Sequence, residues 1–222
     1  MAQRNLLLMF CFVITMGCAH APRGHRFDRA EAWAQRFDAA SRDAWQKPEE
    51  VIEALNLPRN AKVADLGSGT GYFAVRLARA VPDGVVYGLD SEPDMTRYLA
   101  ERARREGLSQ LQALTVSPEA PSLPEKVDLV LCVNTWHHVP NRQTYLDRLR
   151  LFLAPNARVV VIDFTLDAPE GPPRDMRLSA HQVQKEFEAK GFFLKSQMDF
   201  LPRQYGLSFV AAEWGQGSTG SP

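Results

Sequence analysis

Cysteine is scarce in this sequence, and charge of neither sign is in excess. The 222 residues include three cysteines, at positions 11, 18 and 132, which excludes a small disulfide-stapled fold. Lys and Arg together number 26, and so do Asp and Glu, so no net field attracts nucleic acid or a membrane surface. No basic stripe interleaved with aromatic residues is visible either. We therefore expect no nucleic-acid partner.

Long hydrophobic runs are missing apart from one near the amino terminus. Residues 6–17 are almost wholly apolar, but a run of about 12 residues is too short to cross a hydrocarbon core of about 30 Å comfortably. The run follows a short positive opening with Arg4 and has the proportions of a signal-peptide core. It ends at Thr15-Met-Gly-Cys18, which resembles the lipobox of bacterial lipoproteins, although that family prefers Leu, Val or Ile where Thr15 stands.

The lipobox resemblance implies a domain organisation and a location. Residues 1–17 would be a signal peptide, Cys18 would be lipidated as the mature amino terminus, and residues 18–28 would be a tether. Ala19 after the cysteine implies the outer membrane on its periplasmic side, with the membrane reached only through the lipidated end. The alternative is an uncleaved anchor or a misassigned start codon. Arginines downstream of the run outnumber Arg4 and, for a true anchor, favour a cytoplasmic body.

The rest of the chain alternates between helix-like and strand-like segments. Apolar residues at helical spacing predict a helix over 29–40, and Pro48 with two following glutamates predicts another that ends near residue 56. Periodicity, caps and turn residues then predict strands at 62–66, 85–89, 111–116, 127–133 and 158–164, with helices at 72–80, 94–106, 141–152 and 179–190.

This alternation predicts an α/β fold with a doubly wound, mostly parallel sheet and helices on both faces. Two strands expected at 192–200 and 205–212 have no helix between them, so they should form an antiparallel hairpin at one edge. Residues 215–222 have the composition of a disordered tail. One domain is therefore expected, at 29–214, and we expect it to be a monomer.

A glycine-rich loop follows the first predicted strand. Asp65-Leu-Gly-Ser-Gly-Thr-Gly71 leads into a helix, so glycines let the backbone approach a ligand where the first helical N–H groups are free. Nucleotides bind at such carboxyl ends of strands. The motif alone is ambiguous, because Gly69-Thr-Gly-Tyr-Phe-Ala74 also satisfies the dinucleotide pattern Gly-x-Gly-x-x-Ala.

Two carboxylates favour S-adenosylmethionine (AdoMet) as the ligand. Asp65 stands two residues before the first glycine, where it would neutralise the amino group of AdoMet but repel a pyrophosphate. The loop also has three glycines at alternate positions. Asp90 ends the next predicted strand and is well placed to accept both ribose hydroxyls. The sequence therefore predicts AdoMet as the cofactor.

From these motifs the chain resembles the class I AdoMet-dependent methyltransferases, especially the branch that includes quinone-biosynthesis and arsenite methyltransferases. The resemblance covers residues 37–209, including Asp128-Leu-Val-Leu131, His137-His-Val139 and the closing segments Arg177-Leu-Ser179 and 187–192. It implies a Rossmann-like sheet of seven strands, the last antiparallel. It also implies transfer of a methyl group to a small-molecule acceptor.

Carried over residue by residue, the resemblance assigns the ribose to Asp90 and the methionine moiety to the loop. The loop residues concerned are Asp65, Gly67, Ser68, Gly69 and Gly71. Many relatives carry an acidic residue after the third strand that contacts the adenine amine; here Glu119 takes that place or the contact is lost. The family's Pro-Gly-Gly turn is Pro155-Asn-Ala157, and Asn tolerates a left-handed conformation there.

The segment after the fourth predicted strand, Asn134-Thr-Trp-His-His138, stands where the family's substrate cavity opens. Asn134 is expected at the methionine end of the cofactor. His137 is expected to act as a catalytic base or to steer the acceptor, with a structural histidine as the alternative, and for His138 we prefer the structural role. No carboxylate or cysteine stands at ligand spacing on this segment, so we predict no metal site.

Aromatic residues are expected around the acceptor. Trp45, Tyr72 and Trp136 are predicted to line the pocket and to face the sulfonium cation. Trp45 belongs to the segment 44–48, before the first strand, where relatives place a lid. Trp33 and Phe37 are expected to pack in the core instead.

Two other functions stay open at this point. An exported protein would reach a compartment where the AdoMet supply is doubtful, so the fold could serve as a non-catalytic module that binds AdoMet or a nucleoside. A nicotinamide-dependent oxidoreductase is the third possibility. It is disfavoured by Asp65 and by the closing segments.

Overall fold

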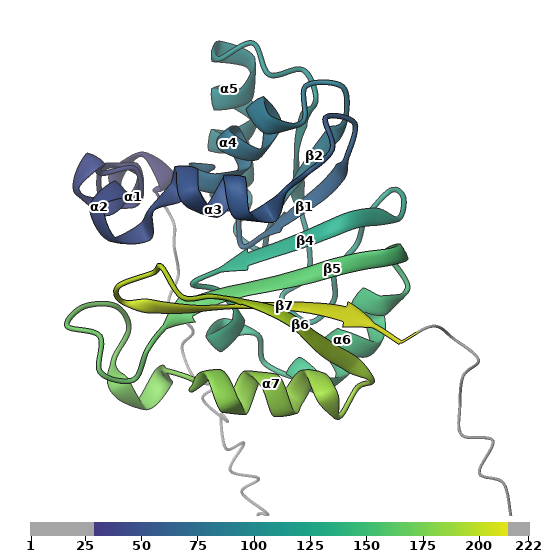
Figure 1. The fold of residues 1–222 in the computed structure, drawn as a ribbon. Helices are drawn as coiled ribbons and strands as arrows, with labels where there is room; N and C mark the ends of the chain where they lie inside the picture. Colours follow the sequence, from purple (N-terminus) through teal and green to yellow (C-terminus); the bar gives the residue numbers. More distant parts are fainter. Residues whose placement is uncertain (1–28, 213–222) are drawn as a thin grey trace, which may run out of the picture.

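A seven-stranded sheet with helices on both faces forms the centre of the computed structural model, which describes residues 29–212 (Figure 1). The strand order is β3-β2-β1-β4-β5-β7-β6. Strands β1 to β5 pair in parallel, whereas β7 runs antiparallel to both β5 and β6. The predicted Rossmann-like fold with an antiparallel hairpin at the carboxyl-terminal edge is confirmed. The predicted signal peptide, the tether with Cys18 and the tail at 215–222 lie outside the described residues.

The strands begin and end close to their predicted positions. They are β1 Lys62–Leu66, β2 Val85–Asp90, β3 Leu111–Thr115, β4 Val127–Val133, β5 Leu153–Phe164, β6 Phe192–Met198 and β7 Gln204–Ala211. β5 starts earlier than predicted, because Leu153 pairs with Val127 before a register shift. Within that stretch Asn156 has φ 62°, the left-handed conformation expected where relatives have glycine.

The helices are α1 Ala30–Phe37, α2 Asp43–Gln46, α3 Pro48–Leu55, α4 Tyr72–Ala80, α5 Pro93–Arg105, α6 Arg142–Arg150 and α7 Ala180–Glu188. Three 3₁₀ turns accompany them, η1 Ala40–Arg42, η2 Trp136–His138 and η3 Arg174–Met176. The cap predicted for α7 is a capping box: the Ser179 hydroxyl accepts from the Gln182 N–H at 3.1 Å, and the Gln182 side chain accepts from the Ser179 N–H at 2.8 Å. Sequence periodicity missed η1 and α2, since each is a single turn.

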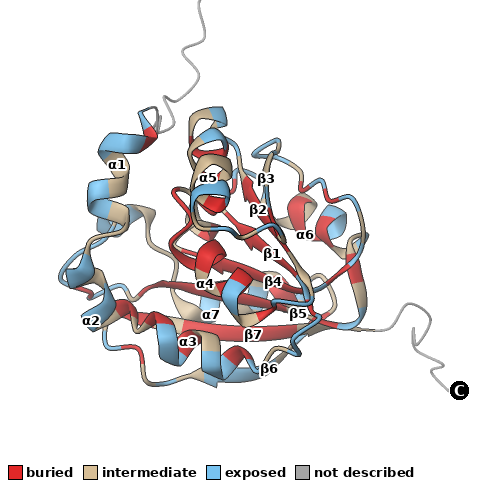
Figure 2. Ribbon diagram, turned by 90° about the horizontal axis from the view of Figure 1, so that it is seen from above, coloured by how far each residue is buried: buried red, intermediate tan, exposed pale blue. Residues whose placement is uncertain are grey.

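Two apolar layers hold the sheet between its helices. Helices α3, α4 and α5 cover one face and contribute Leu55, Leu77 and Leu99 to its core, whereas α6 and α7 cover the other with Leu146 and Phe187. Figure 2 shows buried residues concentrated in the strands and exposed ones on the outer sides of the helices. Because both faces are covered, the interior strands carry near-continuous apolar runs, as predicted for β4.

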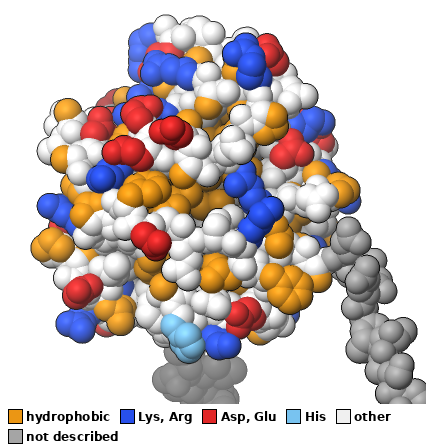
Figure 3. Space-filling model, viewed as in Figure 1, with side chains coloured by type: hydrophobic (Ala, Val, Ile, Leu, Met, Phe, Trp, Pro, Cys, Tyr) orange, Lys and Arg blue, Asp and Glu red, His pale blue; other side chains and the backbone are white. Residues whose placement is uncertain are grey.

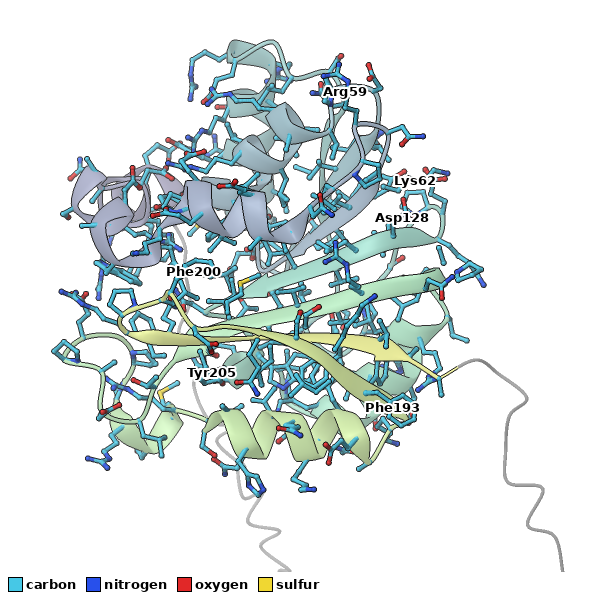
Figure 4. The ribbon with its side chains drawn as sticks, viewed as in Figure 1. Arg59, Lys62, Asp128, Phe193, Phe200 and Tyr205 are labelled. Carbon is cyan, nitrogen blue, oxygen red and sulfur yellow. The ribbon has the colours of Figure 1, made fainter. Side chains whose placement is uncertain are left out.

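The carboxyl ends of the parallel strands lie together at one edge of the sheet. Figure 4 labels Lys62 and Asp128 at the amino ends of β1 and β4, and the opposite ends of these strands lie toward α1 and α2. The chain runs from β1 outward through β2 to β3 and then crosses back to β4 on the other side of β1, so the strand order reverses between β1 and β4. Ligands of open α/β sheets bind at such a switch point.

The surface seen in Figure 3 carries basic and acidic side chains interspersed, in keeping with the even charge balance of the sequence. None of the helices within residues 29–212 has the length and apolar character needed to cross a membrane.

Candidate cofactor and acceptor site

A cavity of about 990 Å³ opens at the carboxyl ends of the strands. This volume is at the upper end of the range of about 300–1,000 Å³ that small-molecule sites occupy. Its walls come from the loops after β1, β2, β3, β4 and β5 and from the segment before β1. Asp65 and Asp90 both line it, so the two carboxylates on which the AdoMet prediction depends share one cavity.

The glycine loop is shaped by close contacts to its neighbours. The N–H groups of Gly67 and Ser68 donate to the carbonyl of Leu89 at 2.8 and 2.9 Å, which fixes the loop on the end of β2. Gly67 has φ 72°, and a Cβ on it would lie 2.2 Å from Oγ1 of Thr135. Only glycine fits there.

The third glycine has a packing role that the sequence did not reveal. Gly71 precedes α4 with φ 96°, and a Cβ there would lie 2.4 Å from a methyl group of Leu99 on α5. Gly67, Ser68 and Gly69 line the cavity, but Gly71 does not. Contact of Gly71 with the cofactor therefore stays a prediction, whereas the structure shows that the lack of a side chain at Gly71 lets α4 and α5 approach each other.

The Asp90 carboxylate is held by backbone donors. Its Oδ2 accepts from the Gly69 N–H at 2.8 Å, and its Oδ1 accepts from the Glu92 N–H at 3.0 Å. Burial raises the pKa of Asp90, and these backbone hydrogen bonds partly counter the rise. A carboxylate has about four acceptor positions, so about two remain for other donors such as ribose hydroxyls.

Asp65 is almost fully buried, with 3% of its surface exposed. Burial raises its pKa to about 7; the positive charge of Arg42 lowers this pKa, while the negative charge of Asp90 raises it further. A cationic ligand group beside Asp65 would favour its ionised form. The position thus suits the amino group of AdoMet on electrostatic grounds.

Arg42 is a cavity residue that the sequence analysis missed. Its guanidinium donates to the Phe37 carbonyl at 2.8 Å and to Oε1 of Gln46 at 3.3 and 3.2 Å, and it lies 3.9 Å from the centre of the Tyr72 ring. Burial lowers the pKa of Arg42 to about 10, so it stays charged at neutral pH. No sequence motif identified Arg42, because it lies in the turn η1 and approaches Asp65 only in the folded chain.

Three buried amides join the segment before β1 to the sheet. Gln46 on α2 donates to Gln204 on β7, Gln204 donates to Asn134, and Asn134 donates back to Gln46 at 3.3 Å. Gln46 and Gln204 are 0% and 3% exposed. Asn134, with φ 54°, lines the cavity as predicted for a residue at the methionine end, and this network fixes its side chain.

Aromatic residues from the segment before β1 line the cavity, including two that were expected to pack in the core. Trp45 lines the cavity and packs against Phe164, with ring centres 5.4 Å apart. Trp33 and Phe37 also line it, their rings stacked at 5.2 Å, so the expectation that they pack in the core is wrong. The reason is that α1 lies against α5 beside the cavity rather than on the sheet.

Two other residues predicted for the site, Trp136 and Glu119, lie outside the wall of the cavity. Trp136 is absent from the wall, because its ring is buried against Tyr145 and Phe187 and its N–H donates to Glu186 at 3.1 Å. Glu119 lies outside the cavity, in an exposed turn.

Tyr72 lines the cavity, but its ring already contacts two guanidinium groups. Those of Arg42 and Arg76 lie 3.9 and 4.3 Å from the ring centre, and its hydroxyl donates to Asp43. The ring is therefore not free to face a sulfonium.

The site retains polar atoms that a ligand could satisfy. The hydroxyls of Ser68 and Thr70 are buried in the loop and have no hydrogen-bond partner within the described part of the chain. Together with two carboxylates and one guanidinium, they match the amino, carboxyl and hydroxyl groups of AdoMet. Over residues 29–212 no group of three or more His, Cys, Asp or Glu side chains is placed to hold a metal ion.

The strand order, the glycine loop and the two carboxylates define a Rossmann-like fold of the AdoMet-dependent methyltransferase class. Residues 57–211 match the protein family described as "Methyltransferase domain", and the chain belongs to that family.

Similar proteins of known sequence are also methyltransferases. "Methyltransferase str3" of Strobilurus tenacellus is 30% identical over 139 residues, which are 62% of this chain and 48% of that protein. "Trans-aconitate 2-methyltransferase" of Mycobacterium tuberculosis (strain ATCC 25177 / H37Ra) is 31% identical over 112 residues, 50% of this chain and 40% of that protein. The chain thus spans less than half the length of these curated relatives.

Solved structures support the fold. A "SAM dependent methyltransferase from Aquifex aeolicus" superimposes with a TM-score of 0.77 at 24% identity, covering 82% of this chain and 98% of that one. "Glycopeptide N-methyltransferase MtfA complexed with (S)-adenosyl-L-methionine" gives a TM-score of 0.62 at 13% identity, covering 74% of this chain and 87% of that one.

Alanine substitutions at two glycines of similar φ can distinguish a steric clash in the loop from the cost of a left-handed backbone. Gly67 has φ +72° and Gly107 has φ +69°, but a Cβ at Gly107 would meet nothing within 4 Å. We expect Gly107→Ala to cost about 1 kcal/mol of stability through its left-handed backbone alone and to leave AdoMet binding unchanged. Gly67→Ala should cost more and weaken AdoMet binding at least tenfold. Thermal melts and calorimetric titration measure both, and equal effects of the two substitutions would contradict the loop geometry.

The raised pKa of Asp65 predicts a pH-dependent affinity. Only the ionised carboxylate pairs with the ammonium of AdoMet, and the pKa of Asp65 in the free protein is about 7. Affinity should therefore rise from pH 5.5 to 7, by up to about tenfold per unit, and level off above. Titration calorimetry of the wild type and of Asp65→Asn tests this. The variant should bind weakly at every pH, and a flat profile in the wild type would refute the electrostatic role of Asp65.

Proposed function

We propose that this protein transfers the methyl group of AdoMet to a small-molecule acceptor. The observation that carries the proposal is that Asp65 and Asp90, from the ends of two neighbouring strands, line one cavity beside the glycine loop. Membership of the methyltransferase-domain family supports it. The alternative of a non-catalytic binding module has no support from the similar proteins, which are named as methyltransferases.

Each end of the cofactor would find a partner in this site. Asp65 would hold the amino group of the methionine moiety, and Arg42 beside it would hold the carboxylate. Asp90 would accept from the ribose hydroxyls. When bound, AdoMet supplies a methyl group on a sulfonium, which is an activated leaving group. The protein's task is then to hold the acceptor in line, and alignment of this kind contributes a large part of a rate enhancement.

The acceptor would occupy the part of the cavity away from the two carboxylates. We assign to it the cavity residues Trp45, Phe164, His137 and 170–173, which come from α2, from the turn after β4, from the end of β5 and from the loop after β5. We further propose that the protein belongs to the branch of the AdoMet-dependent methyltransferases that includes quinone-biosynthesis and arsenite methyltransferases. A 29% match over 124 residues to "Demethylmenaquinone methyltransferase" of Anoxybacillus flavithermus (strain DSM 21510 / WK1), covering 54% of this chain and 51% of that protein, supports this.

Calorimetric titration of the full chain with AdoMet and with its demethylated product tests the proposed function. We expect the wild type to bind both. Asp90→Ala should bind at least tenfold more weakly, because it removes the acceptor for the ribose hydroxyls. Asp83→Asn is the matched control, since Asp83 pairs with Arg59 on the surface outside the cavity. Failure of the wild type to bind either compound, or equal binding by all three proteins, would overturn the assignment.

We further propose that the chain is exported and anchored in the bacterial cell envelope through a lipidated Cys18. The apolar run and the lipobox-like Thr15-Met-Gly-Cys18 support this proposal. Mass spectrometry of the protein from a bacterial host should show a mature amino terminus at Cys18 with added acyl mass, and Cys18→Ser should abolish the modification. An intact, unmodified Met1 would instead favour the cytoplasmic alternative.

A further inference from the structure

We propose that His137 and Asp163 act as a dyad that removes the proton of an aromatic hydroxyl as it is methylated, so that the acceptor is a small phenol. This inference rests on the proposed function and names the class of acceptor. Nδ1 of His137 lies 2.7 Å from Oδ2 of Asp163, and the two side chains are 2% and 3% exposed.

A backbone hydrogen bond orients the Asp163 carboxylate toward His137. Its Oδ1 accepts from the N–H of Phe164 at 2.9 Å, which leaves Oδ2 directed to His137. In the proposed dyad Nδ1 of His137 donates to the Asp163 carboxylate, which can only accept when ionised, and Nε2 is the nitrogen that takes the proton of the acceptor. This is the tautomer that a general base requires.

The dyad lies on the acceptor side of the cavity. His137 belongs to η2, after β4, and lines the wall, whereas the carboxylates assigned to the cofactor come from β1 and β2. Asp163 comes from the end of β5, the strand next to β4.

Two buried tyrosine hydroxyls near the dyad make no hydrogen bond to His137 or Asp163. Tyr205, labelled on β7 in Figure 4, pairs with Asp163 in the strand register, and its buried hydroxyl makes no hydrogen bond within the described residues. The hydroxyl of Tyr145, in the cavity wall, is likewise buried without a partner there. Burial raises the pKa of Tyr145, so it remains a neutral donor that an acceptor oxygen could satisfy.

The shape of this part of the cavity favours an aromatic ring. Trp45 and Phe164 face it with their rings tilted by 39°. The neighbouring Gly171 lies so close to Phe164 that a Cβ would be 2.8 Å from the ring, so the loop after β5 is held against it. The apolar rings of Trp45 and Phe164, with the polar side chain of His137 in the same cavity, suit an aromatic ring that bears a hydroxyl.

The step balances without any further reactant. The acceptor oxygen forms a bond to the methyl carbon while the methyl–sulfur bond breaks, and that electron pair stays on sulfur. The hydroxyl proton moves to Nε2 of His137, and Asp163 stabilises the imidazolium that results. Phenols ionise near pH 10, as tyrosine does, so they gain from a base at neutral pH. A carboxylate acceptor is already ionised and would gain nothing.

Transfer of labelled methyl from AdoMet to catechol, hydroquinone and 3,4-dihydroxybenzyl alcohol tests the proposal, with trans-aconitate and aniline as acceptors of other classes. We expect methyl ethers from the phenols. His137→Gln should lower kcat by about 10²–10⁴-fold and leave affinity for the demethylated cofactor within twofold. His181→Gln, which changes an exposed histidine outside the cavity, should match the wild type.

Asp163 is a positioning residue, so its test needs a readout that loss of folding alone would not give. We expect Asp163→Asn to lower kcat with little change in the KM for either substrate. Nitrogen-15 NMR of the histidine rings should show the His137 proton on Nδ1 in the wild type and a mixed tautomer in the variant.

Several outcomes would overturn the dyad while leaving cofactor binding intact. They are phenol turnover by His137→Gln within threefold of the wild type, turnover confined to trans-aconitate or aniline, and no turnover of any phenol by a wild type that binds AdoMet. An unchanged His137 tautomer in Asp163→Asn would also overturn it. Absence of AdoMet binding by the wild type would instead refute the proposed function itself.

Discussion

The site depends on two carboxylates that are kept out of water at the ends of neighbouring strands. Burial of a charged group is costly unless it is paired, and Asp65 and Asp90 also repel each other. Backbone N–H groups offset that cost for Asp90, and Arg42 does so in part for Asp65. The cost of burying the Asp65 charge that remains uncompensated would be offset by a cationic ligand group and increased by a pyrophosphate. The electrostatics of this site therefore favour a cationic ligand over a pyrophosphate.

The segment before β1 completes this site from outside the sheet. Arg42, Trp45 and Gln46 lie within a few residues of one another, yet they contact Tyr72 at the start of α4, Phe164 on β5 and Gln204 on β7 respectively. The buried amide triangle fixes α2 to the sheet, so the guanidinium of Arg42 has a defined position over Tyr72. The N-terminal segment therefore contributes to the wall of the cavity.

The residues assigned to the cofactor and to the acceptor come from different strands of the sheet. Asp65 and Asp90 come from β1 and β2, whereas His137 follows β4 and Asp163 lies near the end of β5. Their carboxyl ends converge because parallel strands connected by helices all point the same way. Cofactor and acceptor can therefore be held by separate elements and still meet at the point where the strand order reverses.

Most strands, the helix caps and the shared position of Asp65 and Asp90 could be predicted, because they follow from local periodicity and from the geometry of a strand–loop–helix turn. Asn156 took the left-handed conformation expected of it for the same reason. The sequence could not show which distant side chain lies next to a given residue. Trp136 packs on Phe187 from α7, Gly71 lies against Leu99 from α5, and the ring of Tyr72 lies against the guanidinium of Arg42. The sequence by itself determined the order of elements and the loop that marks the ligand site. Only the tertiary structure brought Arg42 to Asp65 and Asp163 to His137, since contacts between residues far apart in the chain are set by packing and leave no periodic trace.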